Sequence, residues 1–241
     1  MRKSKVSIAV IMVILAASAG TNAFGQDAKS TSTRELTIEE LFLKSVEFQI
    51  LREKAFSDDY EIKMSALDDL EEMLENNGVG DNNAQVEFVL EYLAMEGSLH
   101  IVREDKRQIN NFPEVRRRAA GMLGRLGTPE AMRGLITVLL GEKEPMVKAE
   151  AAYALGVIGL NENNEASEAI AFALDREDPT RPDSNFGFAI CLALEKIGKK
   201  TGGIKGQSAY RALVKIAQGN YNKTTKAKAL QVLDTMKSQD K

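Results

Sequence analysis

A pattern of apolar and small residues at helical spacing occurs twice in the middle of the chain, in residues 115–127 and 147–159. The copies read Val-Arg-x-x-Ala-x-x-Met-Leu-Gly-x-Leu-Gly and Val-Lys-x-x-Ala-x-x-Ala-Leu-Gly-x-Ile-Gly, and they lie 32 positions apart. Apolar residues that recur every three or four positions share one face of a helix, so each copy predicts a helix with one buried side. Self-similarity at a fixed period of this size indicates a repeat architecture.

Each copy is expected to be followed by a second helix. Gly127 and Gly159 come just after the last apolar turn, where a left-handed glycine commonly ends a helix. Thr128 and Pro129 then predict a new helix, because proline suits the first helical position. The apolar face of that helix consists of Ala131, Leu135, Val138 and Leu139. One unit is therefore two antiparallel helices, which bury their apolar faces only by stacking on neighbouring units.

Glycine also occurs inside the first helix of both copies, as Gly124 and Gly156. Within a helix glycine costs roughly 1 kcal/mol relative to alanine, so these positions indicate a packing contact with no room for a side chain. The neighbouring Arg116, Arg117 and Arg118 are expected to point toward water.

Weaker copies of the pattern extend the array in both directions. First helices are predicted near Ile62, Phe186 and Thr225, with wider steps between neighbouring copies than in the central pair. Residues 58–61 predict the start of the helix near Ile62, and residues 37–56 predict a helix that covers the first unit. The step from Ile62 to the first central copy is the longest. The residues that it has beyond the 32-residue step of the central pair are expected in segments 76–83 and 97–112. We expect no β-strand anywhere in the chain.

The pattern of the two central copies, residues 115–127 and 147–159, resembles the HEAT repeat, and most closely its short form, the phycobilisome-lyase-type HEAT-like repeat. The tetratricopeptide repeat is disfavoured, because it has a 34-residue period and a tryptophan-containing pattern, whereas this chain has no tryptophan. The resemblance implies an all-α fold, a right-handed α-solenoid of stacked antiparallel helix pairs with about four to five repeats in residues 37–241. It also implies that the second helices line the concave surface.

Residues 1–25 have the features of a secretory signal peptide. A basic start is followed by an uncharged apolar stretch from Val6 to Ala19 and by small residues before Gly25. The alternative is a membrane anchor, but the stretch is shorter than the roughly 20 apolar residues needed to span a bilayer. We expect cleavage after Gly25 or Ala23, no membrane span afterwards, and a periplasmic or secreted protein. Residues 26–36 are polar and are predicted to form a disordered leader.

Charge is distributed unevenly along the chain, whose net charge is −3. Residues 35–100 carry 17 acidic and 4 basic residues, whereas residues 101–241 carry 17 acidic and 23 basic residues. In a solenoid this becomes a charge difference along the length of the molecule. The charged residues either serve only to keep the protein soluble, or they guide a partner electrostatically so that it binds in one orientation.

Catalytic and metal-binding residues are scarce. His100 is the only histidine and Cys191 the only cysteine, so neither a zinc site of ordinary composition nor a disulfide within the chain is expected. Cys191 corresponds to Ala152 and is predicted to be a small buried residue. Residues 81–83 and 178–183 contain oxygen ligands but lack the spacing of a calcium-binding loop. We expect no enzyme activity, no cofactor and no nucleic-acid partner.

The predicted second helices contribute two rows of candidate protein-binding residues. The first row consists of Phe88, Arg133, Glu168 and Arg211, and the second of Tyr92, Thr137, Phe172 and Lys215. Aromatic and charged side chains on one exposed face suit protein recognition. The alternative for Phe88, Tyr92 and Phe172 is that each is partly buried between helices.

These observations lead to two functional hypotheses. The first is an exported, non-catalytic scaffold that binds another protein of the cell envelope or periplasm through its concave surface. The second, implied by the resemblance alone, is a chromophore lyase or lyase-like subunit related to the phycobilisome lyases.

Signal-peptide cleavage gives the first testable prediction. Mass spectrometry of the exported protein should show a mature chain that begins at Phe24 or Gln26, because the expected cleavage follows Ala23 or Gly25. Recovery of a chain that still carries Met1 in an integral membrane fraction would contradict it.

Overall fold

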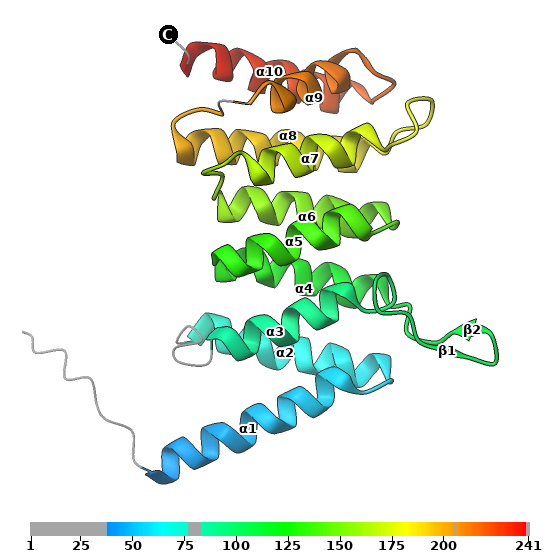
Figure 1. Ribbon diagram of the computed structural model, residues 1–241, viewed down its shortest axis with the longest axis vertical. Coiled ribbons are helices and arrows are strands. Elements are labelled where there is room, and N and C mark those ends of the chain that lie inside the picture. The colour runs from blue at the N-terminus through cyan, green and yellow to red at the C-terminus, as the bar shows by residue number, and fades with distance from the viewer. Residues whose placement is uncertain (1–37, 77–82, 205, 240–241) are drawn as a thin grey trace, which may run out of the picture.

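The computed structural model describes residues 38–76, 83–204 and 206–239 and shows an all-α solenoid (Figure 1). The predicted residues 1–25 and 26–36 lie outside these ranges. The helices are α1 (Ile38–Phe56), α2 (Tyr60–Asn76), α3 (Asn83–Met95), α4 (Pro113–Leu126), α5 (Pro129–Gly141), α6 (Pro145–Ile158), α7 (Glu165–Asp175), α8 (Ser184–Thr201), α9 (Gln207–Gln218) and α10 (Lys223–Gln239). Two short strands, β1 (Arg103–Glu104) and β2 (Arg107–Gln108), lie between α3 and α4.

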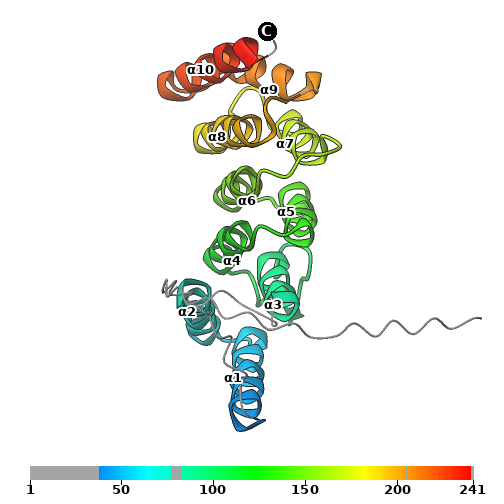
Figure 2. The same ribbon diagram turned by 90° about the vertical axis from the view of Figure 1, so that its left-hand side faces the viewer.

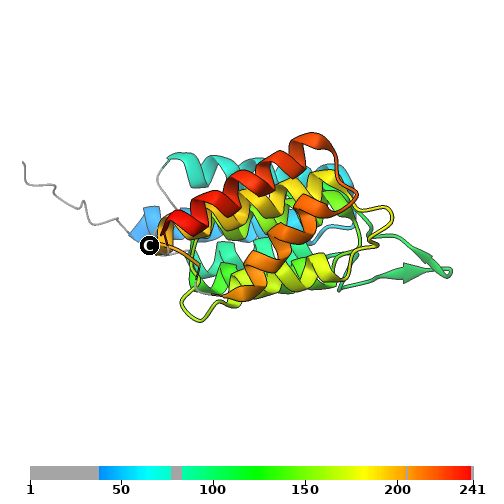
Figure 3. The same cartoon turned by 90° about the horizontal axis from the view of Figure 1, so that it is seen from above.

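The helices form two layers. Helices α2, α4, α6, α8 and α10 make the first-helix layer, and α3, α5, α7 and α9 make the second-helix layer (Figure 2). Four helix pairs therefore stack in sequence order, with α1 at the N-terminal end and α10 at the C-terminal end (Figure 1). Seen along the stack, the pairs lie over one another (Figure 3). The prediction of stacked helix pairs is confirmed.

The repeated glycines and prolines begin and end helices where the sequence predicted. Gly127 and Gly159 have φ values of 73° and 66° and end α4 and α6 in the left-handed conformation. Between α4 and α5, the Thr128 hydroxyl oxygen accepts a hydrogen bond from the Ala131 amide at 3.0 Å. Because Pro129 follows directly, the turn and the start of the next helix are specified by adjacent residues.

The start of α2 differs from the prediction by one residue. Asp59, not Asp58, caps the helix, since its Oδ1 accepts hydrogen bonds from the amides of Glu61 and Ile62 at 2.8 and 3.1 Å. Ile62 holds the register position of the buried Val115 but is 44% exposed, whereas Lys63 is fully buried. At the start of α2 a lysine therefore faces the core, and the apolar residue before it faces solvent.

The expectation of no strands was wrong at residues 97–112. β1 and β2 pair in antiparallel fashion around Asp105 and Lys106, which adopt positive φ values of 47° and 66°. Such a two-residue turn matches the twist of a hairpin. The buried Asn110 holds the base of the hairpin: its Nδ2 donates to the His100 carbonyl at 2.7 Å, and its Oδ1 accepts from the Val102 amide at 3.0 Å. The hairpin projects from the side of the solenoid (Figure 3).

An ion pair removed from solvent recurs in three successive units, and we call it the repeat ion pair. It joins a cation in the first turn of the first helix to an acid just after the second helix. The three pairs are Lys63–Glu96, Arg116–Glu142 and Lys148–Glu177. The Lys63 Nζ lies 2.8 Å from Glu96 Oε2, and the Arg116 Nε lies 2.7 Å from Glu142 Oε2. Lys63 and Arg116 are almost inaccessible to solvent, so both charges depend on these partners.

Arg116 also links one unit to the preceding one. Its Nη1 donates to the Glu96 carbonyl at 3.2 Å and to Asn111 Oδ1 at 3.1 Å. Glu142 in turn accepts hydrogen bonds at Oε1 from the amides of Lys143 and Glu144, which lead into α6. The expectation that Arg116 points toward water was therefore wrong, because the chain supplies a buried carboxylate at the end of α5.

The fourth unit replaces the repeat ion pair with an aromatic contact. Gly187 of α8 occupies the place in the register that Lys148 has in α6. A Cβ atom there would lie 2.6 Å from the ring of Tyr221, which follows α9. The Tyr221 ring fills the volume that a cation and its partner occupy elsewhere, and burial raises the pKa of its hydroxyl to about 12.

Removal of one partner of the repeat ion pair should be strongly destabilising. Arg116→Ala should lower the free energy of unfolding by about 3–5 kcal/mol, because it leaves the Glu142 carboxylate buried without a counter-charge. Urea denaturation followed by circular dichroism measures this difference. The matched control is Arg133→Ala, which removes an exposed pair with Glu130 and should leave the free energy of unfolding almost unchanged. Equal losses in the two variants would contradict the structural role of the buried pair.

Candidate functional site

The first helices α4, α6 and α8 approach one another closely at two glycines. A Cβ atom on Gly124 would lie 2.8 Å from the Ala154 Cβ, and one on Gly156 would lie 2.5 Å from the Ala193 Cα. These distances are too short for any side chain, so α4, α6 and α8 approach backbone to backbone. This explains the two glycines inside the repeated pattern.

Longer side chains separate the second helices. At Gly134 of α5, for example, the nearest group from α3 is the Glu91 carboxylate. Each repeat therefore advances less along the first-helix layer than along the second-helix layer, and the stack must bend toward the first helices. Figure 2 shows this bend: α2 and α10 stand further out than α6, which is recessed between them. The concave surface is thus formed by the first helices, and its predicted assignment to the second helices was wrong.

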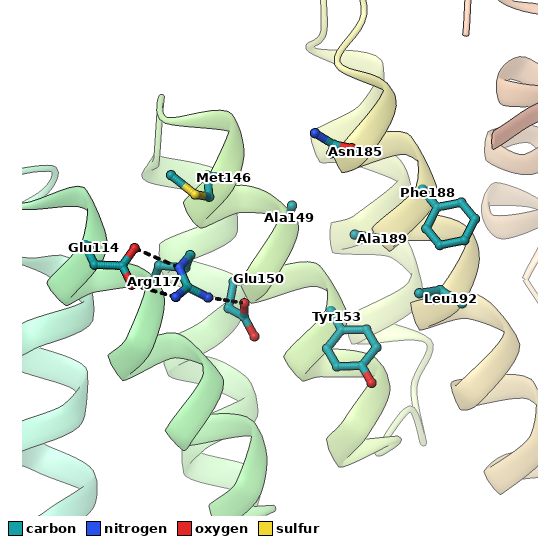
Figure 4. Close-up of a pocket in the computed structure, with 10 residues that line it drawn as sticks. All are labelled: Glu114, Arg117, Met146, Ala149, Glu150, Tyr153, Asn185, Phe188, Ala189 and Leu192. Carbon is teal, nitrogen blue, oxygen red and sulfur yellow. Dashed lines mark hydrogen bonds and ion pairs between the residues drawn. The ribbon is translucent and has the colours of Figure 1, made fainter. Parts of the chain in front are cut away.

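A groove of about 420 Å³ runs across the concave surface between α4, α6 and α8 (Figure 4). It is lined by Glu114, Arg117, Met146, Ala149, Glu150, Tyr153, Asn185, Phe188, Ala189 and Leu192. The α6–α8 end is apolar: Met146 is exposed, and Tyr153, Phe188 and Leu192 are partly exposed. These side chains are accessible because no other part of the described chain covers them.

The α4 end of the groove is charged, and its charges are paired. Arg117 donates to the two Glu114 oxygens at 2.9 and 2.6 Å and to Glu150 at 3.3 Å (Figure 4). Its hydrogen bonds hold the pKa of the Glu114 carboxyl below the ordinary value. Toward α2, Arg118 pairs with Asp68 and Glu71, each at 2.8 Å. The concave surface therefore changes from paired charges at α2–α4 to apolar side chains at α6–α8.

The groove positions differ from unit to unit, although the core positions beside them stay small or apolar. At equivalent places in the register stand Arg117, Ala149 and Phe188, and likewise Gly121, Tyr153 and Leu192. Packing within the solenoid does not dictate such changes in size and charge. The side chains at these places are therefore available for recognition.

Four of the eight predicted binding residues come together on the opposite face. Glu168, Phe172, Arg211 and Lys215 line a groove of about 790 Å³ between α7 and α9. Phe172 is 56% exposed, and Lys215 donates to Asp175 at 2.9 Å and to the Leu174 carbonyl at 3.3 Å. These contacts tie Lys215 to the C-terminal end of α7, so it has a structural role as well.

The other four predicted residues lie apart from that groove. Phe88 is 59% exposed, and its ring meets Phe56 at 6.4 Å between centroids. Tyr92 is half-buried against the same ring at 4.4 Å, and burial raises the pKa of its hydroxyl. Arg133 pairs with Glu130, and the Thr137 hydroxyl donates to the Arg133 carbonyl. Six of the eight residues thus form two clusters at the ends of the second-helix layer, and Arg133 and Thr137 lie between the clusters with partners on α5 itself.

The remaining sequence candidates do not form a reactive site in the described residues. Cys191 is buried as predicted, and burial raises the pKa of its thiol to about 12. His100 stacks on Tyr92 at 6.3 Å between ring centroids. No group of three potential ligands that could hold a metal ion is present within the described ranges. No helix in the same ranges is long and apolar enough to cross a bilayer.

Comparison with known families agrees with this geometry. Residues 107–182, from the hairpin through α7, match the family model for HEAT repeats. These units are HEAT repeats. No curated protein matches the chain. HEAT repeats stack into extended surfaces that serve as scaffolds for protein interaction.

Sequence reasoning missed the groove residues Met146, Tyr153, Phe188 and Leu192. The prediction placed the second helices on the concave surface, so it did not consider the exposed positions of the first helices. Gly124 and Gly156 are the sequence features that could have revealed these groove residues. Close packing in one layer of a solenoid shortens that layer, so the layer with the glycines is the inner one.

The close contact between first helices predicts opposite effects for two glycine substitutions. Gly156→Ala should lower the free energy of unfolding by about 1–3 kcal/mol, because its Cβ would meet the backbone of α8. Gly121→Ala should be neutral or stabilise by up to about 1 kcal/mol, since its Cβ meets only the flexible end of Glu150 and alanine is the better helix former. Thermal and urea unfolding measure both. A Gly156→Ala protein as stable as Gly121→Ala would show that the layers are not packed in this way.

Proposed function

We propose that the protein is an exported, non-catalytic HEAT-repeat scaffold that binds another protein of the cell envelope or periplasm through its concave surface. The observation that carries the proposal is the groove of Figure 4, where apolar side chains from α6 and α8 stand uncovered on the inner face of the stack. Concave surfaces of this kind are where solenoid proteins present an extended binding site.

The side chains of the groove favour a protein partner. Met146, Tyr153 and Phe188 belong to the residue types that are enriched at protein interfaces. The flexible Met146 side chain adapts to different shapes, whereas the two aromatic rings supply a large apolar area at a small entropic cost. The paired charges around Arg117 form a polar border on one side. This combination of an apolar centre and a polar border fits an interface better than it fits a small-molecule pocket.

Export and the class of partner rest on the sequence. The basic start and the short apolar stretch of residues 1–25 support secretion, and their removal takes away Arg2, Lys3 and Lys5, which leaves a net charge of −6. An acidic exported protein does not favour nucleic acid as its partner. The chromophore-lyase alternative rests on the resemblance of the repeat alone, and a shared fold does not carry a shared activity, so we do not propose it.

Substitutions on the two faces test which surface binds. A photo-crosslinking residue at position 146 should capture an envelope protein from cells that export the chain. Phe188→Ala and Tyr153→Ala should each weaken that interaction by about 1–2 kcal/mol, or roughly tenfold, if the two rings are anchors. Binding assays with the captured protein measure the loss, and unchanged thermal stability of each variant shows that the fold is intact.

Phe172→Ala and Arg211→Glu serve as matched controls on the second-helix layer. Both residues line the groove between α7 and α9, so their substitution should leave the interaction unchanged. A larger loss in these two variants than in the concave-surface pair would assign binding to the predicted second-helix rows. Failure to capture any envelope protein at position 146 would count against the proposal as a whole.

A further inference from the structure

The C-terminal end of the solenoid is an open stacking surface. Ala120, Ala152 and Cys191 occupy one register position on successive first helices, and all three are fully buried because the next first helix covers them. Leu230 holds the same register position on α10 and is 54% exposed. A position that is buried in the three preceding units is uncovered here.

The second-helix layer shows the same uncovered end. Met132 of α5 and Ser167 of α7 occupy equivalent places and are buried, whereas Tyr210 of α9 is 37% exposed. Leu230 and Tyr210 are therefore the places where a further unit would pack. No described helix lies beyond α9 and α10 at this end of the stack (Figure 1).

This end is strongly basic. Residues 207–239 contain six Lys and Arg residues and one Asp, a net charge of +5. Lys215 and Lys228 are paired with acids of the preceding unit, but no ion pair is formed in the described residues by Arg211, Lys223, Lys226 and Lys237. The three lysines are spaced at helical intervals on either side of Leu230, which puts them on its face of α10.

The N-terminal end has the opposite charge. Residues 45–75 contain ten acidic and three basic residues, a net charge of −7. On α1, Ile50 is 52% exposed, and Glu47 and Glu53 lie three positions before and after it on the same face. Neither acid forms an ion pair with a described residue. The N-terminal end therefore exposes Ile50 between two carboxylates, and the C-terminal end exposes Leu230 between lysines.

We propose that these two ends bind each other in separate copies of the chain, so that the molecules associate head to tail. The outer face of α1 in one copy would cover Leu230 and Tyr210 of the next. Identical ends repel, since both are basic or both acidic, whereas opposite ends attract. A contact between two different surfaces does not close on itself, so it produces linear chains rather than a symmetric dimer. This inference does not depend on the proposed partner or on the concave surface.

Sedimentation velocity of the exported form tests the association. The weight-average mass should rise with protein concentration in low-salt buffer and return to that of the monomer in high salt, because salt screens the charges at the two ends. Leu230→Asp should raise the dissociation constant at least about tenfold at low salt, since it places an acid within the contact. A monomer at all concentrations in low salt would overturn the proposal.

Paired charge reversals decide the geometry of the contact. Glu47→Lys/Glu53→Lys replaces both carboxylates beside Ile50 with lysines, and Lys226→Glu/Lys237→Glu replaces two of the three lysines on the Leu230 face with carboxylates. Each variant alone should associate much more weakly than the unchanged protein, because like charges then face each other around Ile50 and Leu230. An equal mixture should associate again, since each reversed end meets a complementary end of the other variant. A misfolded variant would not regain association when it is mixed with the other variant, so association in the mixture alone shows that the charges at the contact are responsible.

Charge reversals in the middle of the stack provide the control. Glu162→Lys and Lys143→Glu change residues in loops away from both ends and should leave the association unchanged. A mixture of the two end-reversed variants that stays monomeric, or a variant that forms dimers by itself, would show that the contact does not join opposite ends and would overturn the head-to-tail arrangement.

Discussion

The repeat ion pair is the interaction on which the order of this solenoid depends. A buried charge without a counter-charge is far more costly than an apolar residue in the same place. Lys63 and Arg116 can therefore be buried only where the unit's second helix ends in a carboxylate, at Glu96 and Glu142 respectively. A shift of one helix by a single turn would separate both partners, so the pairs fix how the two helices of a unit align. Apolar contacts alone tolerate such a shift more easily.

The second constraint is the close packing of the first helices. Gly124 and Gly156 allow neighbouring backbones to touch, and this contact shortens one layer relative to the other. The same glycines that cost helix propensity therefore determine on which side the molecule is hollow. The exposed side chains of α6 and α8 face that hollow as a consequence, and their identity is free to vary because the core does not need them.

Much of the fold could be predicted because the central units repeat their pattern so regularly. The helices of residues 113–159, the left-handed glycines and the burial of Cys191 all followed from spacing and residue type. Periodicity failed at Arg116 and Lys63, since it assigns charged residues to the outside and cannot see a carboxylate supplied 26 or 33 positions later. The hairpin was missed because Asp105 and Lys106 are not a typical turn pair. The binding surface was misplaced because curvature is a property of two layers together, which no single helix reveals.

The position of the hairpin has a consequence for how such a chain can change. It lies in the connection that runs from Glu96 to Pro113, and the equivalent connections run from Glu142 to Pro145 and from Glu177 to Ser184. The acid of the repeat ion pair comes before each connection and the next first helix after it, so residues added between them disturb neither layer. Arg116 closes the base of the longest connection through the Glu96 carbonyl and Asn111. Connections of this kind are places where a solenoid can acquire new surface loops while its stacking surfaces stay constant.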